Sequence, residues 1–147
     1  MTNSLDTDVI NYRRRILKQM KHKINHRKQK NRIAIIAGNA SCTIKGQGVS
    51  GGSYDKLYDK TPTLKEKLLI IAKPPKKIGG KSELCNIPIG NCAEDKAARM
   101  VIIKSRNAIL VDNIYFSKAV RIRTCEIIPP CENCKAVFQT LTCYGKI

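Results

Sequence analysis

Two short runs of this chain contain residue types that can carry out chemistry together. The first run is Cys92-Ala-Glu94, and the second is Cys131-Glu-Asn-Cys134, which directly follows a proline. Three soft thiolates can hold a Zn²⁺ ion and leave its fourth position to water, and a neighbouring carboxylate can then transfer protons. A purely structural zinc site does not need that carboxylate. The two runs therefore predict a catalytic zinc centre, with Cys92, Cys131 and Cys134 as ligands and Glu94 as the proton-transfer group.

Two helices are expected to bring these residues together. Pro130 suits the first turn of a helix, and the segment after it has an amphipathic pattern, so Cys131 and Cys134 should meet on that turn. Residues three apart are neighbours on a helix surface, and the positive end of the helix dipole lowers thiol pKa values. A second helix is expected to begin near Cys92 and to bring the third thiolate. Glu94 would then reach the water on the metal without being a ligand.

The residues of both runs resemble the zinc sites of the cytidine-deaminase superfamily. The signature of these sites has the form His-x-Glu, or Cys-x-Glu, followed later by Pro-Cys-x-x-Cys. The combination of Gly90-Asn-Cys-Ala-Glu94 with Pro129-Pro-Cys-Glu-Asn-Cys134 looks most like the YwqJ-type deaminase domains of bacterial polymorphic toxins, and the similarity covers about residues 83–142. The resemblance implies a deaminase that converts cytosine to uracil in single-stranded DNA or RNA, as the toxic domain of a bacterial effector.

The resemblance also implies a role for each matching residue. Glu94 would be the proton shuttle. The backbone amide at Ala93 and main-chain groups around Pro130 would hold the edge of the base. A toxin of this kind would also need a dedicated immunity protein, and we expect that partner to be acidic. The zinc ligands implied by the resemblance are Cys92, Cys131 and Cys134.

Two other functions remain open from the residues alone. Metabolic nucleoside deaminases also use three cysteines and a Cys-Ala-Glu run, but they carry an Asn-x-Glu clamp upstream. This chain has Asn86-Ile-Pro88 there, which lies closer to Cys92 and lacks the Glu. A non-enzymatic zinc module that binds nucleic acid could use Cys85 as a fourth ligand, although its spacing of seven from Cys92 is wider than usual. That module would leave Glu94 without a role.

The charge of the chain favours a polyanionic substrate. Its 147 residues hold 28 Lys and Arg against 11 Asp and Glu, which gives a net charge of +17. Such a chain binds polyanions or acidic proteins, although lysines on a solvated surface would give the same composition. Residues 1–31 are predicted to form a basic helix or linker, and 32–147 the zinc-dependent deaminase domain. The basic helix would either grip a phosphate backbone or dock its apolar stripe on the domain.

Hydrophobic periodicity predicts an α/β fold, with a cytidine deaminase-like sheet built from a β-hairpin, the catalytic helix, a strand and the Cys-x-x-Cys helix. The hairpin would turn at Gly38-Asn39. The expected elements are strands over 32–37 and 40–44, a glycine-rich loop near the pocket mouth over 45–53, a helix over 63–72, strands over 108–111 and 119–125, a helix over 131–141, and a short strand over 142–147.

Few residues outside the two runs are candidates for binding substrate. Asn39 follows a strand-like segment and could contact a ribose, or it could simply form a turn. Aromatic residues that could stack a base are sparse, because the chain has five Tyr, two Phe and no Trp. Tyr54, Tyr58 and Tyr115 are the candidates.

The sequence gives no sign of a signal peptide or a membrane anchor. Its longest apolar run, 68–72, is far shorter than the roughly 20 residues that a membrane span needs. We expect a monomer that does not bind membranes, exported as part of an effector and acting in the cytoplasm of a target cell. The other four cysteines lack a regular spacing and are expected to be free thiols. They are Cys42, Cys85, Cys125 and Cys143.

Overall fold

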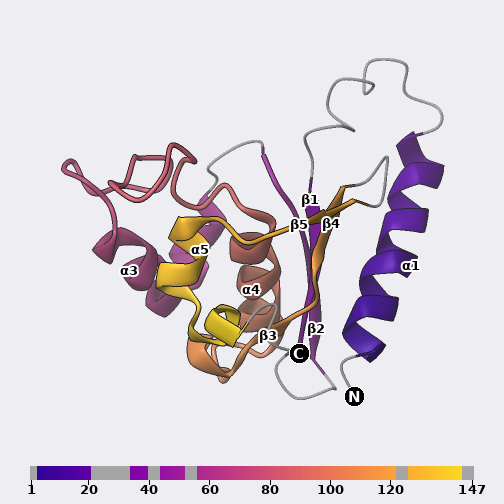
Figure 1. Ribbon diagram of the computed structural model, residues 1–147. Helices are drawn as coiled ribbons and strands as arrows, with labels where there is room; N and C mark the ends of the chain where they lie inside the picture. Colours follow the sequence, from indigo (N-terminus) through magenta and orange to yellow (C-terminus); the bar gives the residue numbers. More distant parts are fainter. Residues whose placement is uncertain (1–2, 21–33, 40–43, 52–55, 122–125, 144–147) are drawn as a thin grey trace.

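The computed structural model describes residues 3–20, 34–39, 44–51, 56–121 and 126–143 (Figure 1). The helices are α1 (Asn3–Met20), α3 (Pro62–Ile70), α4 (Ala93–Lys104) and α5 (Glu132–Val137), with 3-10 turns η2 (Lys56–Lys60), η3 (Val111–Asn113) and η4 (Gln139–Cys143). The strands are β1 (Ala34–Asn39), β2 (Lys45–Val49), β3 (Tyr115–Phe116), β4 (Ala119–Arg121) and β5 (Ile127–Ile128).

The strands form one small sheet that separates two helical layers. Its order is β2-β1-β4-β5, β3 also pairs with β1, and every pair is antiparallel. Helix α1 covers one face of the sheet, and α4 covers the other face, with α3 and α5 beyond it (Figure 1). The fold is therefore a mixture of helices and a small antiparallel sheet, which is compatible with the predicted α/β class. None of the helices in the described ranges is long and apolar enough to cross a membrane.

Helix α1 docks on the sheet through its apolar stripe. Val9 is 2% exposed and packs with Val120 of β4 and Val49 of β2. An ion pair between Asp8 Oδ2 and Lys45 Nζ (3.0 Å) links the same helix to β2. Of the two roles expected for the basic helix, docking is the one that these contacts support over residues 3–20. The expected boundary at residue 31 falls within 21–33, outside the described residues.

Helix α4 approaches strand β2 so closely that only glycine fits between them. A Cβ atom added to Gly46 would lie 2.7 Å from the carbonyl oxygen of Ala97, and one added to Gly48 would lie 2.6 Å from the amide nitrogen of Ala97. The Gly48 Cβ would also overlap the carbonyl group of Ala93. The predicted glycine-rich loop over 45–53 is therefore wrong for 45–49, because these glycines serve helix packing within a strand.

The hairpin and two other predicted elements also differ from the structure. Gly38 and Asn39 belong to β1, where they pair with Gly46 and Lys45, so they do not form the predicted turn. The strand predicted over 108–111 is wrong, because residues 105–114 instead make short-range turns such as Ile114 N–H to Val111 O (3.2 Å). Of the strand predicted over 119–125, residues 119–121 form β4. The strand predicted over 40–44 is wrong at Ile44, which is a bend, and the short strand predicted over 142–147 is wrong at 142–143, which belong to η4. Residues 32–33, 40–43, 122–125 and 144–147 of the predicted strands lie outside the described residues.

The helices predicted after Pro62 and Pro130 are confirmed with shifted bounds. Helix α3 begins at Pro62 itself, since a proline has no N–H to leave unpaired at the first helical position. Helix α5 ends at Val137, and η4 continues the chain as a tighter turn over part of the range predicted as helix. The main core lies between these helices and α4, and Leu64, Val101 and Phe138 are fully buried in it.

We expect Gly48→Ala to destabilise the protein by about 1–3 kcal/mol, because the new methyl group forces α4 away from β2. Gln47→Ala is the matched control, since Gln47 neighbours Gly48 on β2 and its side chain lies on the opposite face. Urea unfolding of both variants would measure the difference. Equal stability of the two variants would contradict the tight packing described for α4.

Candidate metal centre

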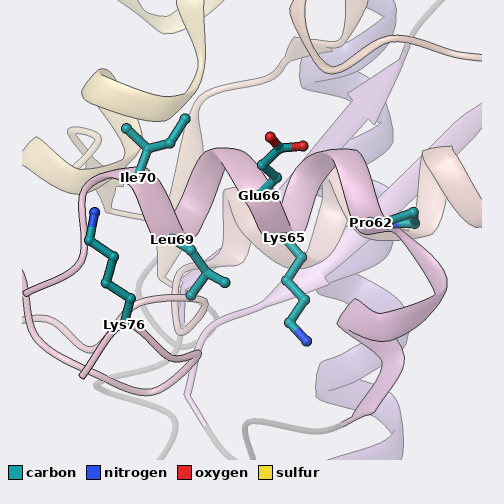
Figure 2. Close-up of a pocket in the computed structure, with 6 residues that line it drawn as sticks. All are labelled: Pro62, Lys65, Glu66, Leu69, Ile70 and Lys76. Atoms are coloured by element: carbon teal, nitrogen blue, oxygen red, sulfur yellow. The ribbon is translucent and has the colours of Figure 1, made fainter. Parts of the chain in front are cut away.

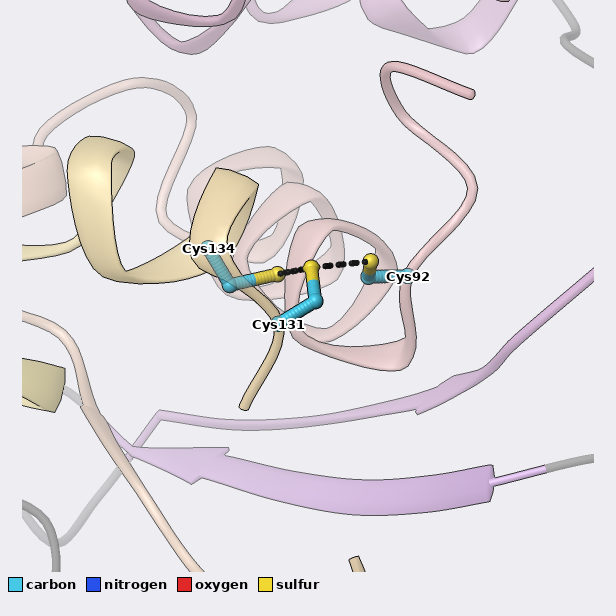
Figure 3. A group of neighbouring side chains, drawn as sticks. All are labelled: Cys92, Cys131 and Cys134. Carbon is cyan, nitrogen blue, oxygen red and sulfur yellow. Dashed lines mark hydrogen bonds between the residues drawn. The ribbon is translucent and has the colours of Figure 1, made fainter. Parts of the chain in front are cut away.

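The three predicted ligands meet where two helices begin. Cys92 is the N-cap residue of α4, Cys131 is the N-cap residue of α5, and Cys134 lies on the first turn of α5. Figure 3 shows their side chains pointing at one another. Cys131 Sγ lies 3.2 Å from Cys92 Sγ and 3.5 Å from Cys134 Sγ, and all three sulfur atoms lie within 4.8 Å of one another. The structure therefore brings together the cysteines that the sequence singled out.

The size and chemistry of this cluster suit a zinc ion. Thiolates bound tetrahedrally at about 2.3 Å from zinc lie about 3.8 Å apart, close to the separations of the sulfur atoms here. Within the described ranges, no other His, Cys, Asp or Glu joins the three cysteines. Cys85 is a half-buried free thiol outside the group, so the four-cysteine structural site has no support from the structure. The side chains of the described residues thus leave one position of a tetrahedral zinc ion to another ligand.

Hydrogen bonds among the thiols concentrate negative charge on one sulfur. The hydrogen bonds that Cys131 shares with Cys134 and then with Cys92 lower the pKa of Cys131 to about 2, and the backbone N–H groups of Cys134 and Asn133 act in the same direction. The same contacts with Cys131 raise the pKa values of Cys92 and Cys134. A cation bound among these sulfur atoms would favour their thiolate forms and displace the remaining protons.

Glu94 is a buried carboxyl group beside this cluster. It is the second residue of α4, and only 5% of it is exposed. Burial raises the pKa of Glu94 to about 7, against the opposing effect of its own backbone N–H and a hydrogen bond with Cys134. Glu94 is not part of the three-thiol group that could hold a metal. A carboxyl group in this place can exchange protons with a molecule at the metal without occupying a coordination position.

The two predicted main-chain contacts, Ala93 and Pro130, lie directly beside the cysteines. Ala93 follows Cys92 and is 1% exposed, and Pro130 is buried and precedes Cys131. Their predicted contact with the edge of a base stays a prediction. Gly51 closes onto the same end of α4, because its N–H donates to the carbonyl of Asn91 (3.0 Å) and its carbonyl accepts from Lys96. Gly51 belongs to the loop predicted over 45–53, so this residue of the predicted loop lies beside the cluster.

The structure places Asn39 away from the cysteines. Its backbone pairs with Lys45, whose carbonyl accepts a hydrogen bond from Lys104 Nζ (2.8 Å) at the last residue of α4. Helix α4 has 12 residues. At about 1.5 Å per residue, its two ends lie roughly 16 Å apart. Asn39 therefore lies near the end of α4 opposite Cys92, and the predicted ribose contact at this centre has no support.

The predicted stacking tyrosines do not line the cluster either. Tyr58 is 1% exposed, and its hydroxyl donates to the carbonyl of Gly90 (2.7 Å), so its ring belongs to the core. Tyr115 is 57% exposed, but it pairs with Asn39 in the sheet and shares its remote position. Tyr54 lies outside the described residues.

Sequence reasoning missed two buried polar residues at the helix starts. Asp95 Oδ2 accepts a hydrogen bond from the backbone N–H of Cys92 (3.3 Å), and burial raises the pKa of this carboxyl well above its usual range. The spacing of three between Cys92 and Asp95, typical of a capping box, could have indicated it. The second residue is Asn133, between the two cysteines of α5, which is 4% exposed. The sequence carries no comparable signal for its burial.

A surface hollow of about 370 Å³ lies on α3, away from this chemistry (Figure 2). Its lining offers lysines, one exposed glutamate and aliphatic side chains, but no thiol and no buried carboxylate. We assign it no reaction. The lining residues are Pro62, Lys65, Glu66, Leu69, Ile70 and Lys76.

Comparisons of the chain with protein-family models, curated proteins and solved structures found no match. The functional argument therefore depends on the cluster itself. Three thiols at two helix starts can bind a soft cation with an open position, and the buried Glu94 beside them can transfer protons. This combination is suited to hydrolysis at a polarised carbon.

We expect the wild-type protein to bind one zinc per chain and Cys134→Ser to lose it, because two thiolates hold the ion far more weakly than three. Cys85→Ser is the matched control and should keep full zinc, since Cys85 lies outside the cluster. Elemental analysis after gel filtration would measure both. Zinc retained by Cys134→Ser, or lost from Cys85→Ser, would contradict the ligand assignment.

Proposed function

We propose that the protein is a zinc-dependent nucleobase deaminase that converts cytosine to uracil in single-stranded DNA or RNA. One observation carries this proposal, namely the buried carboxyl group of Glu94 next to a three-thiol cluster that leaves one ligand position open. A structural zinc site gains nothing from such a carboxyl group, whose burial is costly. The motif resemblance to the cytidine-deaminase superfamily supports the same function.

The residues of the cluster have different roles in the proposed reaction. Cys92, Cys131 and Cys134 would hold the zinc, which when bound supplies a Lewis acid that lowers the pKa of a water molecule to about 7. Glu94 would accept one proton from the attacking water and deliver it to N3 of the base, and would then carry the second proton of that water to the departing amino group. The C4–N bond breaks and a C4–O bond forms, so cytosine and water give uracil and ammonia. The main chain at Ala93 and Pro130 would hold the base edge.

Charge supports a polymer rather than a free nucleoside as the substrate. The chain carries a net charge of +17, and four exposed lysines follow α3 in the segment that leads to the centre. A strand bound at the cysteines could place its phosphates against these lysines, which gives a salt-dependent affinity. Helix α1 lies on the opposite face of the sheet, so its exposed Arg14 and Arg15 would contact only a more distant part of a polymer. The four lysines are Lys73, Lys76, Lys77 and Lys81.

The same features support a role as the toxic domain of a bacterial effector. The motif combination resembles toxin deaminases, and uncontrolled deamination of nucleic acid would injure the cell that makes the enzyme. We propose that the domain is delivered into the cytoplasm of a target cell and that an acidic immunity protein restrains it in the producing cell. A strongly basic domain associates quickly with an acidic partner because of electrostatic steering.

We expect Glu94→Gln to keep zinc and fold but to lose at least about 10²- to 10⁴-fold in deamination, because the amide cannot accept the proton of water. Wild type and variant would be incubated with cytidine, single-stranded DNA, duplex DNA and RNA, and uracil and inosine measured by mass spectrometry. Glu132→Gln is the matched control, since Glu132 is exposed. Near-normal turnover in zinc-loaded Glu94→Gln would exclude the mechanism. Activity on cytidine alone would favour a metabolic enzyme.

We expect expression of the wild-type domain in bacteria to be toxic or mutagenic and expression of Glu94→Gln to be tolerated. If DNA is the substrate, C-to-T changes should rise in cells that repair uracil poorly. Whole-genome sequencing of surviving colonies would measure this. Harmless expression of a zinc-loaded, catalytically active domain would contradict the toxin proposal while leaving the deaminase proposal intact.

A further inference from the structure

The side chain of Asn133 joins two parts of the chain that both carry cysteines of the centre. Its Oδ1 accepts a hydrogen bond from Ser82 Oγ (2.5 Å), and its Nδ2 donates to the carbonyl of Ile87 (2.9 Å). Both Asn133 and Ser82 are buried, with exposed fractions of 4% and 5%. Each polar atom of the buried amide thus has a partner in the segment that leads to Cys92.

The segment that leads to Cys92 is also held at other points, such as the hydrogen bonds that Gly90 and Asn91 accept from Tyr58 and Gly51 and the buried side chain of Ile89. Between α3 and α4 it is irregular, and its backbone is held by a bridge between Ala72 and Ser82 and by paired hydrogen bonds between residues 79–80 and Ile89. Ser82 Oγ also accepts a hydrogen bond from the N–H of Leu84 (3.2 Å). Asn133 therefore connects the start of α5 to the chain that ends at Cys92.

Asn133 also lies between two of the cysteines along the chain. It directly precedes Cys134 and follows Cys131 by two residues at the start of α5. When Ser82 and Ile87 fix its side chain, they also fix the backbone that joins these two cysteines. Groups that orient metal ligands without binding the metal themselves commonly lower the metal affinity when they are removed.

We propose that Asn133 is a positioning residue for the metal centre. Its side chain holds the start of α5, with Cys131 and Cys134, and the segment that ends at Cys92 in the relative position at which the three sulfur atoms converge. Asparagine fits this place because it offers a donor and an acceptor at once. Aspartate keeps the acceptor for Ser82 but has no donor for Ile87, and alanine has neither. The inference rests on the proposed metal site and not on the deamination reaction.

The test uses cobalt(II) as the probe in metal-free protein, because its visible absorption reports the number of sulfur ligands and their geometry. The variants are Asn133→Ala, Asn133→Asp and Ser82→Ala. Glu132→Ala is the matched control, since Glu132 is the exposed neighbour of Asn133 and its carboxylate accepts a hydrogen bond from the side chain of Lys135 (3.2 Å). Cobalt affinity and spectrum are measured with urea unfolding of each metal-free protein, so that stability and metal geometry are read separately.

We expect both Asn133 variants to bind cobalt about 10- to 100-fold more weakly, with altered absorption bands, and Glu132→Ala to match wild type. Ser82→Ala should lose less cobalt affinity than the Asn133 variants, and in a double variant its loss should not add to that of Asn133→Ala. Ser82→Ala also keeps the test valid if Asn133→Ala does not fold. Wild-type affinity and spectrum in Ser82→Ala and Asn133→Asp would overturn the inference while leaving the metal site intact. A wild-type protein that binds no cobalt would overturn the metal site and this inference together.

Discussion

The close contact between α4 and β2 is the constraint on which the candidate centre depends. Gly46 and Gly48 have no side chain, so the first two turns of α4 lie directly on the strand. This contact fixes the start of the helix, and with it Cys92 and the buried Glu94. Any larger residue at Gly48 would move the helix start relative to α5, which carries the other two cysteines. The geometry of the centre is therefore set by backbone packing before any metal binds.

The sequence predicted which three cysteines converge better than it predicted the structure around them. The starts of α4 and α5 could be located because Pro130, an apolar pattern and paired cysteines are local signals. The role of Gly46 and Gly48 could not be predicted, because glycine weakens a strand locally and here serves a helix 50 residues away in sequence.

Residues whose role depends on distant partners were also missed or misplaced. Asn133 is buried only because Ser82 and Ile87 reach it from another segment. Asn39 was assigned to a turn from its type, but strand pairing with Lys45 places it at the opposite end of α4 from the cysteines. Sequence patterns specify local structure, and these positions are determined by tertiary contacts.

The basic helix α1 and the candidate metal centre lie on opposite faces of the sheet. The sheet separates α1 from the cysteines, so the most basic helix stabilises the sheet face that the centre does not use (Figure 1). The basic segment between α3 and α4 lies instead on the chain that leads into Cys92 and is tied to α5 by Asn133. A polyanion held by that segment would thus be coupled to the position of the ligands, which links the proposed substrate to the proposed metal site.

The central claim is that three cysteines hold a zinc ion whose fourth position is open to a small molecule. X-ray absorption at the zinc edge of the purified wild-type protein tests it most directly, since sulfur and oxygen scatter at different distances. The account predicts three sulfur atoms at about 2.3 Å and one oxygen at about 2.0 Å. Four sulfur atoms, or a spectrum without sulfur, would contradict it.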